Sequence, residues 1–122
     1  MDDIFSAPEP LTPMMPPVAL KAIVLSSTTI LLTWSDTTLG RNQRVMDNRY
    51  YTVRYGTKVL TKYKMVNATD LNLHVEDLRP DTEYEFSVRV TKGNRQSTWS
   101  LSVFNRTKEA GSITSSIHSF NP

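Results

Sequence analysis

The sequence of 122 residues contains no cysteine, only two histidines and a net charge of only +2. Without cysteine, the chain can form neither a disulfide nor a thiolate metal site. A net charge this small gives no reason to expect nucleic-acid binding. No apolar run reaches the roughly 18–20 residues that cross a membrane. Asp2 and Asp3 stand where a signal peptide carries basic residues, so an extracellular location would make this chain a segment of a longer protein.

Catalytic motifs are missing as well. His74 is predicted on the outer face of a strand and His118 in the C-terminal tail, so neither belongs to a metal-binding spacing. The sequence has no nucleophile elbow and no phosphate-binding loop. Glu83 and Glu85 are two residues apart, which places both on one solvated strand face rather than in a catalytic pair. We therefore predict no enzyme activity, no metal and no cofactor.

Proline and small polar residues mark the two ends of the chain. Residues 1–17 hold five of the seven prolines, which disfavours helix and central strand and favours an extended linker. The Pro10–Pro13 spacing also matches the PxxP motif of SH3 ligands, although a linker is the favoured interpretation. Residues 109–122 are predicted to be a flexible tail, which leaves residues 18–108 for one folded domain.

The domain region is dominated by apolar residues that alternate with polar ones. This period of two predicts strands, and no helical period is present. The expected fold class is an all-β, seven-stranded antiparallel immunoglobulin-like sandwich. In the last strand, Leu101 and Val103 are expected to point inward, and Asn67 is expected in a turn. Six of the predicted strands cover residues 18–24, 29–34, 50–55, 62–66, 71–76 and 99–107. The seventh follows the turn at Pro80, has Tyr84 as its first inward residue and runs to Val90.

The stretch from Leu78 to Phe86 carries the most specific fold signal. It reads Leu-x-Pro-x-Thr-x-Tyr and continues in strand alternation. A tyrosine in this place can form a tyrosine corner, in which its hydroxyl bonds to backbone just upstream. We predict Trp34, Tyr51, Leu78 and Tyr84 as structural core residues.

These residues together resemble a fibronectin type III domain over residues 16–108. Four shorter runs, Pro8–Pro17, Tyr50–Arg54, Tyr84–Val88 and Ser97–Ser100, are similar to the fifth such domain of the netrin receptor family. The resemblance implies the extracellular part of a single-pass cell-surface receptor acting in axon guidance, migration and adhesion. It implies netrin or a repulsive guidance molecule as protein ligand, with neighbouring fibronectin domains as partners. The domain resemblance rests on Pro16-Pro17, Trp34, Tyr51-x-Val53-x-Tyr55, Leu78-x-Pro80-x-Thr82-x-Tyr84 and Thr107.

A basic face is the candidate binding site. In this fold the third and sixth strands are neighbours, so their outward faces bring Arg54 near Arg89. This face either docks an acidic partner or sulfated glycan such as heparan sulfate, or is an ordinary solvated surface. The loop over residues 35–48 and the turn over residues 92–97, expected at one end of the sandwich, form the other candidate surface. The full basic set is Arg54, Lys62, Lys64, Arg89, Lys92 and Arg95.

Two further motifs complete the candidate sites. Ser97-Thr98-Trp99-Ser100 resembles half of the Trp-Ser-x-Trp-Ser motif of cytokine receptors, in which tryptophans stack on arginines. We expect a cation–π contact of Trp99 with Arg89 or Arg54, and a structural role is favoured over ligand contact. Asn67 and Asn105 each begin an Asn-x-Thr glycosylation sequon, with Asn67 the more accessible of the two.

Two readings of function stay open beside the receptor module. One is a structural spacer that holds neighbouring domains at a fixed reach, in a cell-surface or an intracellular fibronectin-repeat protein. The absence of cysteine allows the intracellular case, while the sequons and the linker argue against it. The other is nucleic-acid binding through Arg41, Arg44 and Arg49, which is disfavoured because basic residues beside tyrosines are not in themselves a stacking platform.

Overall fold

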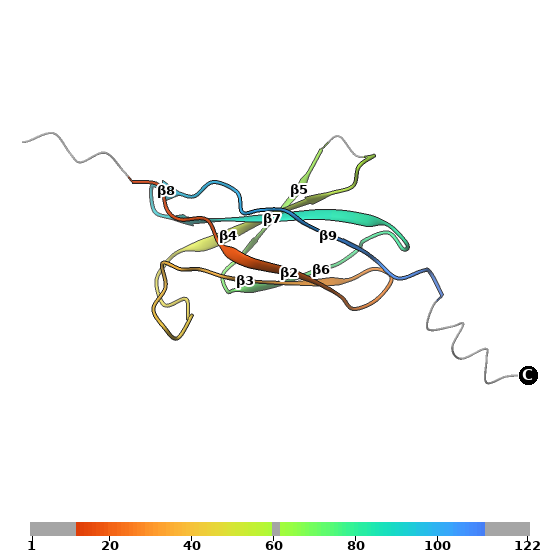
Figure 1. Cartoon of the computed structure of the whole chain (residues 1–122), viewed down its shortest axis with the longest axis horizontal. Helices are drawn as coiled ribbons and strands as arrows, with labels where there is room; N and C mark the ends of the chain where they lie inside the picture. Colours follow the sequence, from red (N-terminus) through yellow and green to blue (C-terminus); the bar gives the residue numbers. More distant parts are fainter. Residues whose placement is uncertain (1–11, 60–61, 112–122) are drawn as a thin grey trace, which may run out of the picture.

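A computed structural model describes residues 12–59 and 62–111. All regular secondary structure in this part is β-strand. Two antiparallel sheets lie face to face (Figure 1). The sheet order is β2-β3-β6 in one layer and β5-β4-β7-β8 in the other, with β9 also paired to β7. The strands are β2 (Val18–Val24), β3 (Ile30–Ser35), β4 (Tyr50–Gly56), β5 (Lys64–Ala68), β6 (Asn72–Val75), β7 (Glu83–Lys92), β8 (Arg95–Gln96) and β9 (Val103–Arg106).

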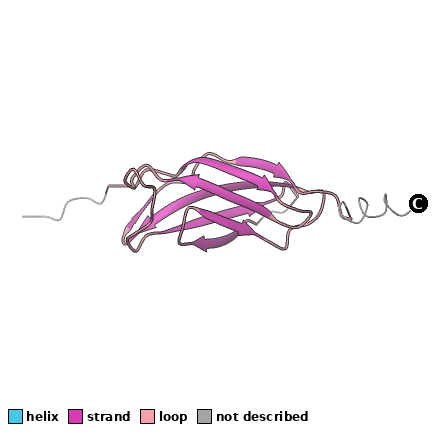
Figure 2. Cartoon of the chain, turned by 90° about the horizontal axis from the view of Figure 1, so that it is seen from below, coloured by secondary structure: helices cyan, strands magenta, loops and turns pink. Residues whose placement is uncertain are grey.

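The predicted immunoglobulin-like sandwich is confirmed (Figure 2). The described residues contain eight strands rather than seven, because two-residue β8 forms a short hairpin with the end of β7. Strand β5 begins at Lys64 rather than Lys62 and extends to Ala68. Asn67 therefore lies in a strand and not in the predicted turn.

Alternation builds the core between the two sheets. Trp34 from β3 packs on Tyr51 from β4, with ring centroids 5.5 Å apart and planes tilted by 59°. Tilted aromatic pairs at this separation contribute beyond simple area burial. The four predicted core residues are all buried, with exposed fractions of 4% for Trp34, 0% for Tyr51, 4% for Leu78 and 5% for Tyr84.

A tyrosine corner fixes the start of β7, as the sequence predicts. The Tyr84 hydroxyl accepts a 2.8 Å hydrogen bond from the backbone N–H of Arg79. The hydroxyl of Thr107 accepts a bond from the N–H of Thr82 and donates to the carbonyl of Arg79. The turn before β7 is thereby tied to the residue that follows β9, so this end of the sandwich is closed by side-chain hydrogen bonds.

The chain enters and leaves the sandwich at opposite ends (Figure 1). The predicted linker lies outside the described residues up to residue 11, and the predicted tail, with His118, from residue 112. The described end of the linker packs on the domain: Met14 is 4% exposed and belongs to the core cluster. The Arg95 Nε donates a 3.0 Å bond to the carbonyl of Thr12.

The first half of the last predicted strand, residues 99–107, is not a regular strand in the structure. Only β9 is regular strand, and Leu101, predicted inward, is 90% exposed. Two serines explain the change, because Ser97 and Ser100 both bond to β7 although they are three residues apart. This spacing breaks the period of two, so the inward positions resume only at Val103, which packs against the core.

Candidate functional site

The site occupies the outward face of the five-stranded sheet. Strands β4 and β7 are neighbours, as predicted, with Thr52 opposite Arg89 and Arg54 opposite Ser87. Arg54 and Arg89 are thus diagonal neighbours on the same face, within reach of a large side chain placed between them. The Arg54 Nε donates a 2.8 Å bond to the hydroxyl of Ser87, which fixes the direction of the guanidinium.

Serine hydroxyls position the side chain that fills this gap. The N–H of Ser97 donates to the carbonyl of Val90, and the N–H of Val90 donates back to the Ser97 hydroxyl at 3.0 Å. Ser100 repeats the arrangement with Val88, at 2.8 and 3.0 Å. Each hydroxyl takes the place of a backbone carbonyl in a regular ladder, so residues 97–100 are bonded to β7 without forming a regular strand. Trp99 is carried on this segment.

Trp99 lies between the two arginines and contacts both, where the sequence predicted a cation–π contact with Arg89 or Arg54. The indole ring is 4.3 Å from the Arg54 guanidinium carbon and 4.5 Å from that of Arg89. The Tyr63 ring extends the stack on the far side, 4.9 Å from Arg54. We call Tyr63, Arg54, Trp99 and Arg89 the arginine stack. Each contact contributes about 0.5–2 kcal/mol, depending on how far water is excluded.

Tyr63 is the member of the stack that the sequence did not reveal. Its hydroxyl donates a 3.1 Å bond to Glu85 on β7, so the ring crosses the end of β4. Gly56 makes room for it, since a Cβ at that position would lie 3.2 Å from the ring. An aromatic residue followed by an edge strand, opposite a glycine at a strand end, is the signal that could have indicated this contact.

The other predicted basic residues are not part of the arginine stack. Lys64 pairs with Tyr55, and Met65 pairs with Arg54, so Lys64 points to the opposite side of the sheet from the stack. Lys62 is exposed and precedes β5. The expected position of Lys64 on the face of Arg54 is therefore wrong, because a shift of one residue in register reverses the face of every side chain in a strand.

Lys92 and Arg95 are also occupied elsewhere. The alternation of β7 places Lys92 on the same side of the sheet as the inward residues Val88 and Val90. Its Nζ lies 3.2 Å from the carboxylate of Asp47. Arg95 pairs with Lys92 across the turn and bonds to the linker carbonyl of Thr12. The loop over residues 36–49 and the turn after β7 thus meet at one end of the sandwich, as expected, and they meet through an ion pair.

A buried ionic network, which the sequence did not reveal, holds the long loop. Asp36 is 0% exposed and accepts bonds from Arg49 at 2.9 Å and from the Tyr51 hydroxyl at 2.8 Å. Thr38 donates to the same carboxylate with its hydroxyl and its N–H. The outer side of the Arg49 guanidinium bonds to Asp47 at 2.8 Å. The partners are up to fifteen residues apart in sequence, so no local pattern predicts them.

The network shifts the titration of its own members. Burial alone would raise the pKa of Asp36, but hydrogen bonds from Thr38, Tyr51 and Arg49 outweigh it and hold this pKa below its ordinary value. The hydrogen bond from Arg49 lowers the pKa of Asp47 even further. Burial, followed by the bond to Asp36, raises the pKa of Tyr51. The loop end is therefore locked in one charge state at neutral pH.

The two glycosylation sequons differ in exposure. Asn67 is exposed on β5, opposite Thr52, whose hydroxyl donates a 2.9 Å bond to the Asn67 Oδ1. Asn105 is partly buried, and its Nδ2, the atom that would carry a glycan, donates a 2.8 Å bond to the carbonyl of Ala22. Asn105 thereby joins β9 to the edge of the other sheet, which disfavours it as an acceptor.

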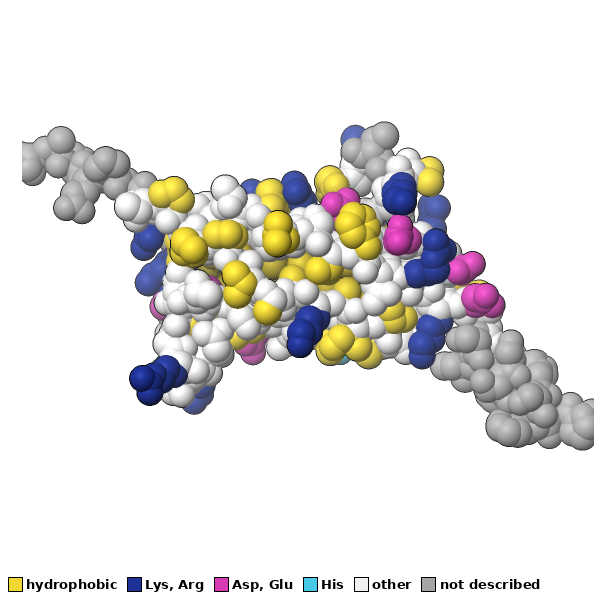
Figure 3. Space-filling model, in the orientation of Figure 1, with side chains coloured by type: hydrophobic (Ala, Val, Ile, Leu, Met, Phe, Trp, Pro, Cys, Tyr) yellow, Lys and Arg dark blue, Asp and Glu magenta, His cyan; other side chains and the backbone are white. Residues whose placement is uncertain are grey.

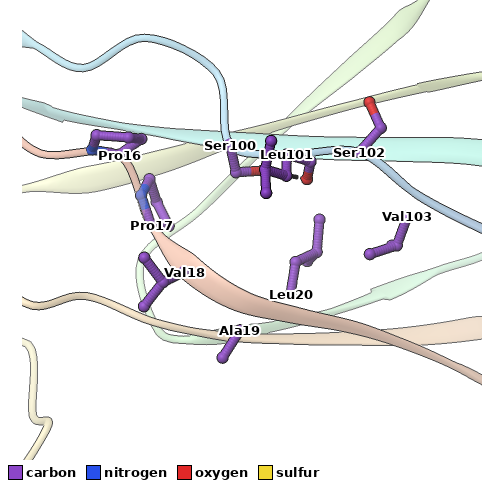
Figure 4. A pocket seen from close by; sticks show the side chains of 9 residues that line it. All are labelled: Pro16, Pro17, Val18, Ala19, Leu20, Ser100, Leu101, Ser102 and Val103. Atoms are coloured by element: carbon purple, nitrogen blue, oxygen red, sulfur yellow. Dashed lines mark hydrogen bonds between the residues drawn. The ribbon is translucent and has the colours of Figure 1, made fainter.

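An apolar groove lies along the seam between β2 and the segment before β9. Its volume is about 390 Å³, and its walls include Pro17, Leu20, Leu101 and Val103. Leu20 and Val103 point toward one another across it (Figure 4). Apolar side chains gather over this seam, while Lys and Arg lie mostly toward the two ends of the molecule (Figure 3).

Residues 12–59 and 62–111 carry neither a metal-binding cluster nor a membrane-spanning helix. This part contains no group of three or more His, Asp or Glu side chains arranged to hold a metal ion. It also contains no helix of the length and apolar character that spanning a membrane requires.

The sandwich, the tyrosine corner and the arginine stack define a fibronectin-like module. The model of the fibronectin type III domain matches residues 15–106, and the chain belongs to this family. Human neogenin is 53% identical over 104 residues, which cover 84% of this chain and 7% of neogenin. The human netrin receptor DCC is 41% identical over 107 residues, covering 86% of this chain and 7% of the receptor.

A solved structure supports the same fold. The FN5 domain of Drosophila Lar superposes with a TM-score of 0.64 at 22% identity, covering 81% of this chain and 100% of that domain. The chain spans only 7% of the length of human neogenin and of human DCC. The similarity therefore assigns one domain of a much longer kind of protein.

Proposed function

We propose that this domain is a non-catalytic extracellular module of a netrin-receptor-like cell-surface protein and contributes to binding a protein ligand. The single observation that carries the proposal is the arginine stack. Trp99 holds two guanidinium groups at 4.3 and 4.5 Å from one ring, on the outward face of the five-stranded sheet, where all three side chains are half-buried. Fixed guanidinium groups lose less entropy on binding an anion than free side chains do.

The ligand class follows from this charge and from the relatives. Neighbouring guanidinium edges recognise carboxylate or sulfate groups. One of the similar proteins is by name a netrin receptor. We therefore propose netrin or a repulsive guidance molecule as the protein ligand, with sulfated glycan of the heparan sulfate type as a second acidic partner. Such contacts act mainly on the encounter rate and weaken with salt.

Titration of the chain with netrin, with a repulsive guidance molecule and with heparin tests the proposal. Arg54→Ala and Arg89→Ala are expected to weaken binding of at least one of them, with the loss shrinking as salt is raised. Lys21→Ala is the matched control, since Lys21 is an exposed cation on β2 in the other sheet. Thermal unfolding of each variant separates loss of binding from loss of fold. Unchanged binding in both arginine variants would contradict the proposal.

A second candidate function, a spacer between neighbouring fibronectin domains, has its own supporting observation. The described end of the linker is fixed to the domain by buried Met14 and by the bond from Arg95 to Thr12. The chain leaves at the opposite end of the sandwich (Figure 1). A rigid entry and an opposite exit suit a module that sets a fixed reach. Arg95→Ala loosens the entry without touching the arginine stack. In a binding assay, ligand affinity is expected to stay unchanged if binding rests on the stack, and to change if the fixed reach is what matters.

A further inference from the structure

The glycosylation candidate Asn67 lies in the same row of the sheet as Arg89, one member of the arginine stack. Asn67 on β5 pairs with Thr52 on β4, and Thr52 pairs with Arg89 on β7. Strands in a sheet lie about 4.8 Å apart, so Asn67 is about 10 Å from Arg89 across the outward face. Trp99 contacts Arg89 in this row and Arg54 in the next one.

Thr52 is the residue between Asn67 and Arg89 in this row, and it packs against its neighbours on the outward face. Its side chain points outward, on the face opposite the core, yet the residue is only 6% exposed. Its neighbours on this face therefore cover it, and one of them is Asn67, to which the Thr52 hydroxyl bonds at 2.9 Å. This bond uses the Asn67 Oδ1 and leaves Nδ2, the atom that carries an N-linked glycan, with no hydrogen bond to a described residue.

We propose that an N-linked glycan on Asn67 and an acidic ligand on the arginine stack exclude one another. Occupancy of Asn67 then regulates the binding face, a statement that rests on the proposed function. A glycan is bulky and solvated, and its attachment point is about two strand spacings from Arg89. The free domain presents both guanidinium groups, whereas the glycosylated domain presents sugar over the same face.

A glycan on the second sequon, at Asn105, would not cover the arginine stack. Asn105 lies on β9 and its Nδ2 bonds to the carbonyl of Ala22 on β2, at the seam between the sheets. Its strand partner on β7 is Tyr84, whose side chain belongs to the core face. Asn105 is therefore on the other face of the sheet from the arginine stack, which makes the exclusion specific to Asn67.

The test uses the chain secreted from mammalian cells, with heparin as the acidic probe. Thr69→Ala destroys the sequon but keeps Asn67 and its bond to Thr52. Mass spectrometry establishes occupancy, and the heparin affinity of the glycosylated chain is compared with that of the Thr69→Ala chain. We expect roughly tenfold tighter binding without the glycan, the scale on which access to a charged patch changes association. Arg54→Ala in the Thr69→Ala background is expected to remove the gain.

The outcomes separate the two proposals. Equal affinity of the glycosylated and the Thr69→Ala chains, together with a loss on Arg54→Ala in both, overturns the exclusion and leaves the proposed function standing. An Asn67 that carries no glycan in the secreted protein also overturns it. If neither Arg54→Ala nor Arg89→Ala changes the binding of any probe, the proposed function fails and the exclusion fails with it.

Discussion

The guanidinium of Arg49 lies 2.9 Å from the carboxylate of Asp36, and the two side chains are 5% and 0% exposed. Arg49 stands immediately before β4, and Asp36 follows β3 directly, so the pair joins the two sheets at the base of the long loop. A buried pair of this kind depends on both partners, because either charge alone would lack compensation.

Asp36→Asn should therefore be strongly destabilising. The amide keeps the size of the side chain but leaves the Arg49 charge without its buried partner, at a cost of about 3–5 kcal/mol. Urea unfolding measures this loss. Asp47→Asn removes the half-exposed partner of the same arginine and is expected to cost about 1 kcal/mol or less. Equal losses in the two variants would show that the burial of Asp36 does not make its pair with Arg49 more stabilising than the Arg49–Asp47 pair.

Stability should fall in acid for the same reason. The pKa values of Asp36 and Asp47 are both lowered in the folded state from an ordinary value of 3.8. A lowered carboxyl pKa stabilises the fold fully above the unfolded value, and this stabilisation is lost as pH falls through the folded value. Melting temperatures measured from about pH 7 to about pH 2 are expected to drop below about pH 4. A smaller drop in the Asp36→Asn variant would assign the effect to this network.

Ser100→Ala tests the segment that carries Trp99. The Ser100 hydroxyl accepts a bond from the buried N–H of Val88, which the substitution leaves unsatisfied. The expected loss is about 1–3 kcal/mol in urea unfolding. Ser102→Ala, two residues further along and exposed, is the matched control and should change little. A neutral Ser100→Ala would mean that Trp99 is held by its arginines alone.

Sequence patterns predicted what depends on local periodicity. The alternation in β3, β4 and β7 indicated the core, and Leu78–Phe86 indicated the tyrosine corner, because these features need only neighbours along the chain. The contact of Trp99 with arginine followed from a motif. The face of Lys64 was missed because it depends on register, which a single strand does not reveal. The Asp36–Arg49 pair was missed because it depends on the path of a loop.

Tyr84→Phe should separate the scaffold from the site. The Tyr84 hydroxyl bonds only to the turn before β7 among the described residues, and the ring lies in the core. Losing one such bond is expected to cost about 1 kcal/mol, with the affinity of the folded fraction for heparin or netrin unchanged. Unfolding curves and titrations on the same samples check both parts. A large loss of affinity in fully folded protein would place the binding site nearer to this corner.

Asn105 should be free of glycan in the folded, secreted protein. Its Nδ2 donates to the carbonyl of Ala22, so a sugar on this nitrogen would have to fit into the seam between the two sheets. Thr107, which completes the sequon, is 3% exposed and holds Arg79 and Thr82. Peptide mapping by mass spectrometry is expected to find glycan at Asn67 and none at Asn105. Asn105→Asp, which keeps the shape but removes the donor, should lower stability by about 1 kcal/mol. A glycan found at Asn105 in protein that melts normally would show that β9 can leave the edge of β2.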